Sequence, residues 1–314
     1  MQTARVRIAP HVLETPLTRS PLLSRALGYE VWLKQENRQH TGSFKPRGAL
    51  NKLLSLHAEA RSRGIVAASA GNHALGVAYA CQVAGVAHTE LFVQATAAPA
   101  KIAKLREYPV RLHLVGQTYE DAERAALAHA RETGATFVSA YDDPDVIAGQ
   151  GTCGLEIVER LPAVDAVVVP VGGGALSAGI ALAVKSFRPQ ARVIGVNAAA
   201  SPSALLSFQK GYAHDPFAHE PTLAQGLAGG YGRLPFAVAR DRIDEIVLVT
   251  DDEMKKGIAA LIDSDQILAE ASGVAAVAAL VAGKVAGLAG RVVAVVSGGN
   301  IDTGTLKAIL DGRG

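Results

Sequence analysis

The sequence predicts an α/β protein with parallel β-sheets, and two features of the chain support this fold class. Short runs rich in β-branched residues alternate with segments of helix length, as they do in βαβ units. Turns that contain glycine or serine follow several of these runs directly, where a buried strand would pass into a helix. The chain has 314 residues, of which 49% are hydrophobic, so it can form one large core or two ordinary ones.

The expected elements follow one another as a series of βαβ units. A first helix starts near Lys45, because Pro46 fits the first helical position and an apolar stripe with helical spacing runs from Ala49 to Leu56. Strands are expected at Ile65–Ala68, Leu91–Gln94, Val110–Leu114, Phe137–Ser139, Ala166–Val171, Val193–Val196 and Val292–Val296. The helices that connect them include Ala74–Val83, Tyr119–Thr133 and Ser177–Phe187.

The charge, cysteine and hydrophobic content of the chain indicate which partners and which cellular compartment to expect. There are 31 basic and 29 acidic residues and no long run of one sign, so we expect neither a nucleic-acid nor a membrane partner. Residues 1–10 hold no continuous signal core, and the apolar segment 273–283 is too short to span a bilayer. Neither Cys81 and Cys153 nor the nine histidines have metal-ligand spacing. We therefore expect buried thiols, no metal site and a cytoplasmic protein.

One lysine lies where a series of small residues leads into a helix, in the segment Thr41-Gly42-Ser43-Phe44-Lys45-Pro46-Arg47-Gly48-Ala49. The partial positive charge of a helix N-terminus disfavours an ammonium group, so the Lys45 amine is expected to become neutral more easily and to attack an aldehyde. Phe44 would supply an apolar plate beside that amine. These features favour a Schiff-base lysine over a solvated surface lysine.

Three glycines follow the expected strand Ala166–Val171 and precede a helix. The run Gly172-Gly173-Gly174-Ala175-Leu176 lets backbone N–H groups approach an anion at a helix N-terminus, so we expect a phosphate group there. A dinucleotide-binding turn competes with this hypothesis. However, the glycine spacing is not G-x-G-x-x-G, and the next strand ends in Asn197 instead of a carboxylate. A tight βα turn without a ligand is the third interpretation.

Two more turns carry polar residues at strand ends. Ser69-Ala70-Gly71-Asn72-His73 leads from a strand into a helix, where its N–H groups and the Ser69 hydroxyl can hold a carboxylate. Its serine and asparagine could equally be ordinary N-caps. Asn72 offers both a donor and an acceptor, and the His73 side chain is expected to be a packing residue. Ser297 ends the strand Val292–Val296, where it could also be an ordinary turn serine.

Together these segments resemble the fold type II pyridoxal-phosphate enzymes, in the group of serine/threonine dehydratases and serine racemases. The Lys45 segment resembles the lysine segment of that family, Ser69–His73 its substrate-carboxylate loop, and Gly172–Leu176 its phosphate loop. Ala148-Gly149-Gln150-Gly151-Thr152 resembles its mid-chain turn, and Ser297-Gly298-Gly299-Asn300 its cofactor-nitrogen segment. The five segments occur in the order of the family and cover nearly the whole chain.

The resemblance implies two parallel-sheet α/β domains, with the smaller one, residues 51–143, inserted into a larger one formed by residues 1–50 and 144–314. It implies pyridoxal 5′-phosphate as the cofactor, Lys45 as the catalytic residue, and an amino acid as the substrate. A homodimer is the expected assembly. The residues implied to bind the cofactor are Phe44, Lys45, Asn72, Gly172, Gly173, Gly174, Ala175, Leu176 and Ser297, and those implied to bind the substrate are Ser69, Ala70, Gly71, His73 and Gln150.

The reaction that the resemblance implies is α,β-elimination from a β-hydroxy amino acid of the L-threonine or L-serine type, which gives a 2-oxo acid and ammonia. Ser297 would be a neutral partner for the ring nitrogen of the cofactor, which favours elimination over transamination. A racemase is the nearest competing function, but it needs a second base, and Ala70 stands where racemases of the family commonly carry a serine. A dehydratase of 3-hydroxyaspartate or another unusual β-hydroxy amino acid, a β-replacing synthase and a non-catalytic binding protein also compete with this function.

Some positions depart from the pattern of the family. Asn197 and Ser203 stand where relatives with a divalent-cation site carry carboxylates, so metal activation is not expected. Gln225 stands where an aspartate is typical, which suggests altered domain docking or substrate preference. Glu270 either borders the active cleft or complements the dipole of the helix that it precedes.

Overall fold

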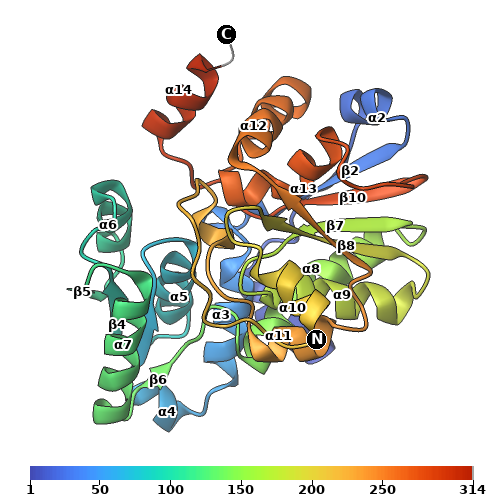
Figure 1. Cartoon of the computed structure of the whole chain (residues 1–314). Helices are drawn as coiled ribbons and strands as arrows, with labels where there is room; N and C mark the ends of the chain where they lie inside the picture. Colours follow the sequence, from blue (N-terminus) through green and yellow to red (C-terminus); the bar gives the residue numbers. More distant parts are fainter. Residues whose placement is uncertain (313–314) are drawn as a thin grey trace.

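The computed structural model describes residues 1–312, which form a six-stranded and a four-stranded β-sheet with helices packed around both (Figure 1). The strands are β1 (Leu17–Ser20), β2 (Glu30–Gln35), β3 (Ile65–Ala68), β4 (Thr89–Val93), β5 (Arg111–Leu114), β6 (Thr136–Phe137), β7 (Ala166–Pro170), β8 (Arg192–Ala198), β9 (Glu245–Val249) and β10 (Arg291–Val296). The α-helices are α1 (Gln2–Ile8), α2 (Pro21–Leu27), α3 (Lys45–Ser55), α4 (Ala58–Ser62), α5 (Asn72–Val83), α6 (Pro99–Arg106), α7 (Tyr119–Thr133), α8 (Pro144–Arg160), α9 (Ala175–Phe187), α10 (Ser203–Lys210), α11 (Arg233–Ala239), α12 (Asp251–Asp265), α13 (Ala271–Val281) and α14 (Thr303–Asp311). Short 3-10 helices are η1 (Ala9–His11), η2 (Glu36–Arg38), η3 (His40–Gly42) and η4 (Gln225–Leu227).

The six-stranded sheet has the order β1-β2-β10-β7-β8-β9, in which β1 is antiparallel to β2 and the other neighbours are parallel. Its central strands are buried on both faces, which explains why they are nearly continuous apolar runs. In β7, Val168 packs with residues of α12 and α13, whereas Val167 and Val169 pack on the opposite face with residues of α8 and α9. Helices therefore cover both faces of this sheet.

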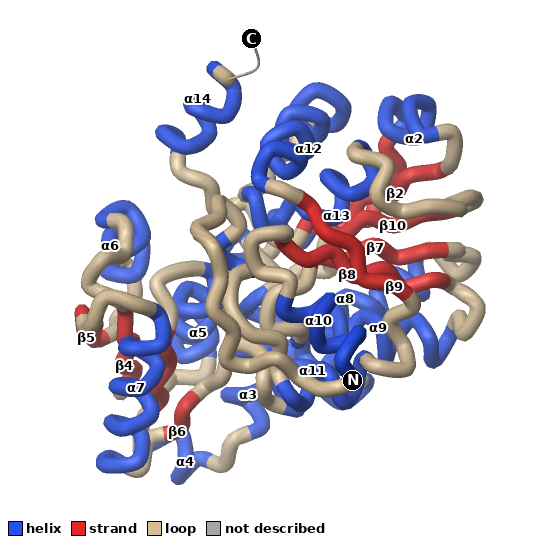
Figure 2. Tube along the Cα trace, viewed as in Figure 1, coloured by secondary structure: helices blue, strands red, loops and turns tan. Residues whose placement is uncertain are grey.

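The four-stranded sheet has the order β5-β4-β3-β6 and is parallel throughout. Ile65 and Ala67 of β3 pack on α3 and α5, and Val66 and Ala68 pack on α7. All four strands lie between residues 65 and 137, whereas the six-stranded sheet takes strands from both sides of that segment. In Figure 2 the two groups of strands are well separated. The domain boundaries at residues 50 and 143 stay predictions.

The α/β fold class with parallel sheets is confirmed, as is the burial of the free thiols Cys81 and Cys153. The seven expected strands are present with small differences at their ends, but β1, β2 and β9 were not predicted. Lys45 is itself the first residue of α3 and Pro46 the second. Among the helices within residues 1–312, none combines the length and hydropathy that a bilayer-spanning segment needs.

The expectation of a turn at residues 148–152 is wrong, because this segment lies inside α8. The helix starts where the Asp143 side chain accepts hydrogen bonds from the N–H groups of Asp145 and Val146. Its glycines serve helix packing, since a Cβ at Gly149 would lie 2.4 Å from the carbonyl oxygen of Arg47 and one at Gly151 would lie 3.1 Å from that of Gly179. The glycines let α3 and α9 approach α8 closely.

Candidate active site

The start of α3 lies beside the end of β10. The N–H of Phe44 donates to the carbonyl oxygen of Ser297 at 3.1 Å, and Ser43 pairs with Gly298 in an isolated β-bridge. Gly172 follows β7, which is the neighbour of β10 in the sheet. Because the carboxyl ends of parallel strands lie at one edge of a sheet, Phe44, Ser297 and the glycine run are brought to the same edge.

The Lys45 amine is held by a neutral acceptor. Its Nζ donates to the carbonyl oxygen of Ala140 at 3.0 Å and lies 5.1 Å from the centre of the Phe44 ring. Burial lowers the pKa of Lys45 to about 8, and within residues 1–312 no carboxylate opposes this shift. The expected direction agrees with this value, and burial is its cause. A lysine in this state is a nucleophile and a base near neutral pH.

The glycine run adopts a conformation that only glycine fits. Gly174 is the N-cap of α9 with φ of 99°, and a Cβ there would lie 2.4 Å from the Tyr231 ring. A Cβ at Gly173 would lie 2.3 Å from the Tyr141 ring, and one at Gly172 would lie 2.4 Å from a carbonyl oxygen. No side chain caps α9, so the N–H groups of its first turn are open to an anion.

The strand after the glycine run, β8, carries Asn197 where a dinucleotide-binding turn needs a carboxylate. Asn197 is buried, its Nδ2 donates to the carbonyl oxygen of Val171, and its Oδ1 accepts from the N–H of Ala204. The side chain therefore holds the backbone at this strand end together. Ala175, the first residue of α9, has no positive φ, so the replacement of a glycine at this position is tolerated.

Two residues that the sequence pattern did not identify connect Lys45 to the glycine run. The carbonyl of Ala140 accepts from Lys45, and the ring of the next residue, Tyr141, lies against Gly173. The Tyr141 hydroxyl donates to Asp215 at 3.1 Å. Both residues follow β6 closely, so a search for polar residues after strand ends could have identified Tyr141, whereas Ala140 contributes only its backbone carbonyl and gives no such signal.

The loop before α5 has an open helix N-terminus. Gly71 is the N-cap, no side chain caps the helix, and the Ser69 Oγ accepts from the N–H of Gly71 at 3.0 Å. Neither Ser69 nor Asn72 therefore acts as the N-cap, which was the competing interpretation. The N–H groups of the first turn of α5 are free to hold a carboxylate.

Asn72 is fixed by two polar side chains. Its amide donates to Glu270 and accepts from Asn300 Nδ2 at 2.8 Å, and Asn300 also donates to the carbonyl of Thr41. Glu270 is the N-cap residue of α13, but its side chain makes no capping hydrogen bond. Its carboxylate accepts from Asn72 instead. Burial raises the pKa of Glu270, and the hydrogen bond from Asn72 opposes this shift.

Further contacts join the segment of the four-stranded sheet to the rest of the chain. Lys101 Nζ of α6 donates to Gln225 Oε1 at 2.5 Å, and Lys104 Nζ lies 3.5 Å from Asn300 Oδ1. Gln225, which replaces the typical aspartate, therefore has a lysine as its hydrogen-bond donor.

His73 and Gln150 are buried. His73 Nε2 lies 2.9 Å from the carbonyl oxygen of Val138, so it carries the proton and donates. Burial lowers the pKa of His73 to about 3, and the charge of Lys45 adds to this effect. The amide of Gln150 lies against Gly48, and its Oε1 has no partner within residues 1–312. Contacts of Ser69, Ala70, Gly71, His73 and Gln150 with a substrate stay predictions.

The residues fit pyridoxal phosphate. The site offers a partly buried amine whose acceptor is a backbone carbonyl, and a glycine cradle at an uncapped helix N-terminus, which is suited to a phosphate. No group of three or more His, Cys, Asp or Glu side chains within residues 1–312 could hold a metal ion.

Comparison with known proteins agrees with this fit. Residues 8–298 match the family model described as pyridoxal-phosphate dependent enzyme. The chain is 42% identical to the L-threonine ammonia-lyase of Geobacter sulfurreducens over 315 residues, which cover 99% of this chain and 77% of the relative. The processed form of threonine deaminase isoform 2 from Solanum lycopersicum has a TM-score of 0.90 and 33% identity, covering 100% of this chain and 88% of that one. Maize serine racemase has a TM-score of 0.91 and 29% identity, covering 99% and 96%. The fold and family expected from the sequence are thus confirmed: the chain belongs to the family of pyridoxal-phosphate dependent enzymes, with the type II fold.

Proposed function

We propose that this protein is a pyridoxal-phosphate dependent dehydratase, or ammonia-lyase, of β-hydroxy amino acids of the L-threonine or L-serine type. The observation that carries the proposal is the Lys45 amine, which has a pKa of about 8 and a backbone carbonyl as its acceptor. The threonine ammonia-lyase and threonine deaminase among its relatives support the same reaction.

Most of the predicted site residues have a role in this proposal. When bound, the cofactor supplies an electron-withdrawing ring that acidifies the Cα–H bond of an attached amino acid. Gly172, Gly173, Gly174, Ala175 and Leu176 would hold its phosphate, and Phe44, Asn72 and Ser297 would lie against its ring. The N–H groups of the first turn of α5 would hold the substrate carboxylate and so fix the orientation of the Cα–H bond.

Lys45 is the proton carrier. In its neutral form it takes the proton from Cα, and loss of hydroxide from Cβ as water requires one proton in return. The Ala140 carbonyl orients the amine by accepting one of its hydrogens at 3.0 Å. The enamine that is released hydrolyses to a 2-oxo acid and ammonia, which completes an elimination without net oxidation.

Racemisation is the second candidate, because serine racemases share this fold. It needs a second acid–base group on the face of the substrate opposite Lys45. Ala70 offers only a methyl group, and the buried neutral His73 already donates its proton to Val138. The residues of this loop therefore favour elimination.

The test is a panel of β-hydroxy amino acids, including serine, threonine and 3-hydroxyaspartate, assayed for 2-oxo acid and ammonia. We expect product from at least one L-isomer and none with the Lys45→Ala variant. Rapid appearance of the D-isomer without 2-oxo acid would instead support a racemase. Absence of a Schiff-base absorption band after addition of pyridoxal phosphate would support a non-catalytic binding protein.

We further propose a cytoplasmic homodimer, from the balanced charge, the two unpaired cysteines and the general prevalence of two-fold symmetric oligomers. Equilibrium sedimentation of the purified protein tests the assembly.

A further inference from the structure

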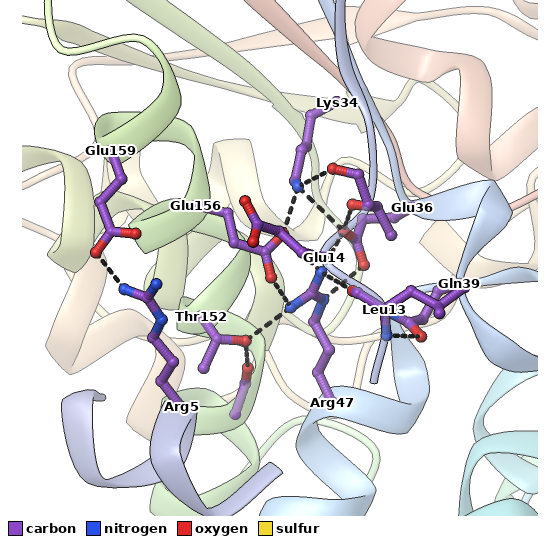
Figure 3. A network of polar contacts seen from close by, with 12 residues as sticks. Arg5, Leu13, Glu14, Lys34, Glu36, Gln39, Arg47, Thr152, Glu156 and Glu159 are labelled. Carbon is purple, nitrogen blue, oxygen red and sulfur yellow. Dashed lines mark hydrogen bonds and ion pairs between the residues drawn. The ribbon is translucent and has the colours of Figure 1, made fainter. Parts of the chain in front are cut away.

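A cluster of buried charges lies at the start of α3, next to Lys45 in the chain. Figure 3 shows its four members, Lys34, Glu36, Arg47 and Glu156, which we call the Arg47 cluster. Arg47 and Glu36 are fully buried, Lys34 is 1% exposed and Glu156 is 6% exposed. The proposed chemistry at Lys45 uses none of these four side chains directly, so their presence needs another explanation.

The guanidinium of Arg47 binds both carboxylates in a fork. Its Nε and Nη2 donate to Glu36 at 2.8 and 2.9 Å, and its Nη1 and Nη2 donate to Glu156 at 2.6 and 2.9 Å. It also donates to the Thr152 hydroxyl at 3.1 Å and the carbonyl of Leu13 at 3.2 Å. One side chain thereby joins the first turn of α3 to η2, to α8 and to the N-terminal segment.

Lys34 completes the charge balance of the cluster. Its Nζ donates to Glu156 and to the carbonyl of Thr15. Burial alone would lower the pKa of Arg47, but Glu36 and Glu156 outweigh it and raise that pKa. The cluster therefore matches two basic side chains with two acidic ones in a dry environment.

Stability alone does not account for such a cluster. Removing four charges from water is costly, and apolar residues of similar volume often stabilise a protein as well or better. A bidentate arginine offers defined geometry instead, because its planar fork allows only a narrow range of positions for each carboxylate.

The first turn of α3 is packed so closely that a small displacement is resisted on two sides. A Cβ at Gly149 of α8 would lie 2.4 Å from the carbonyl oxygen of Arg47. A Cβ at Gly76 of α5 would lie 2.9 Å from Cβ of Lys45 and 3.0 Å from its carbonyl carbon. The backbone of Lys45 to Arg47 thus lies between Gly149 and Gly76. The bonds from Arg47 to Glu36 also tie this backbone to η2.

We propose that Arg47 is a positioning residue for Lys45: through its bonds to Glu36 and Glu156 it fixes the first turn of α3 and so keeps the Lys45 amine against the Ala140 carbonyl, shielded from water. The inference rests on the proposed role of Lys45 in the reaction.

The test measures Lys45 in the cofactor-free protein. The rate at which acetic anhydride modifies Lys45 is followed by peptide mass spectrometry as a function of pH, and the midpoint of the profile reports when the amine becomes neutral. The wild-type midpoint is expected near pH 8. The variant Arg47→Met/Glu36→Gln loses the fork, but Lys34 and Glu156 keep the net charge of the cluster at zero. A change in the labelling midpoint of this variant therefore reflects geometry and not net charge.

We expect the midpoint to rise by one pH unit or more in Arg47→Met/Glu36→Gln, because water reaches the amine, and to rise by a smaller amount in Arg47→Lys, which keeps the charge but lacks the fork. If the double variant does not fold, Arg47→Lys decides the question. The matched control is Lys52→Met, which removes an ion pair with Asp143 at the other end of the same helix and should leave the midpoint unchanged.

An unchanged midpoint in folded Arg47 variants, or an equal shift in Lys52→Met, would overturn the proposal. A second readout is the steady-state kinetics of the loaded enzyme, where Arg47→Lys should lower kcat at least tenfold with little change in KM. Equal changes in both constants would count against positioning. Because the labelling experiment involves neither cofactor nor substrate, its failure is distinguishable from failure of the proposed dehydratase reaction.

Discussion

Replacing Lys45 by methionine should abolish activity and at the same time stabilise the cofactor-free protein. The amine is partly buried without a carboxylate partner within residues 1–312, and burial lowers its pKa from 10.5 to about 8. The folded state therefore disfavours the ammonium form that the unfolded chain accepts freely. Methionine has a similar length, fills the same space and carries no charge to desolvate.

The size of the effect follows from the two pKa values. A fall from 10.5 to about 8 corresponds to about 3 kcal/mol. The partial exposure of the side chain reduces this to about 2 kcal/mol, and the lost hydrogen bond to Ala140 removes about 1 kcal/mol more. We expect a net gain of about 1 kcal/mol in the free energy of unfolding at pH 7.

The sign of the pH dependence provides a sharper check. At pH 7 the amine is largely protonated in both states, so the wild-type protein bears nearly the full penalty. Between about pH 8 and 10.5 the unfolded chain binds the proton more strongly than the folded chain, so the wild-type stability rises with pH in this window. The variant lacks that rise, so its advantage should shrink across this window and turn into a deficit from the lost hydrogen bond to Ala140 as the pH approaches 10.5.

Urea unfolding of both cofactor-free proteins at pH 7 and at pH 9.5 measures the difference. Lys52→Met is the control, because that lysine pairs with Asp143 at 2.6 Å and its loss should destabilise the protein. The reasoning is refuted if Lys45→Met is less stable than the wild type at pH 7 and the gap is the same at both pH values.

Three further substitutions test other parts of the site. Gly173→Ala places a Cβ 2.3 Å from the Tyr141 ring and should weaken cofactor binding at least tenfold in an absorbance titration, whereas Gly304→Ala in α14 should have no effect. Gly149→Ala should lower the free energy of unfolding by about 1–3 kcal/mol in urea, since its Cβ overlaps the Arg47 carbonyl; an unchanged midpoint would contradict the close packing of α3 on α8. Ala70→Ser should add slow formation of the D-isomer from an L-substrate, detected by chiral chromatography, and if none appears, the methyl group of Ala70 is not what limits racemisation.

Strands that are buried on both faces were predictable from the sequence, whereas β1, β2 and β9 were missed. β3, β7, β8 and β10 are apolar runs, and their expected ends differ from the structure by at most two residues. β2 was missed because Lys34 and Gln35 interrupt its pattern, although both side chains are buried in the structure. β1 is a four-residue edge strand, and β9 was missed although Ile246–Val249 is an apolar run.

The error at residues 148–152 has a different origin. A turn was expected at Gly149 and Gly151 because the segment resembles the mid-chain turn of the family, and glycine does lower helix propensity. Their function depends on the Arg47 and Gly179 backbones, which approach α8 from distant parts of the chain. Spacing within the segment contains no information about these neighbours, so a helix that needs glycine for packing resembles a turn.

The candidate site likewise has parts that the local sequence pattern predicts and parts that depend on residues far away in the sequence. The glycine run and the open N-terminus of α5 are built from consecutive residues, so their local pattern predicted them. The contacts of Asn72 with Glu270 and of Arg47 with Glu156 join residues more than one hundred positions apart, and no local pattern specifies such partners.

The pKa of Lys45 shows why these distant contacts matter for function. The sequence suggested that a helix N-terminus lowers it, an effect that acts over one turn and weakens with salt. The structure attributes the shift to burial, which depends on every group that keeps water away from the amine. Gly76, Gly149 and Arg47 do not accept a hydrogen bond from the amine, yet each limits where the first turn of α3 can lie. The reactivity of the lysine is therefore a property of the packing around α3, and substitutions at these positions should change it as surely as substitutions that contact the amine.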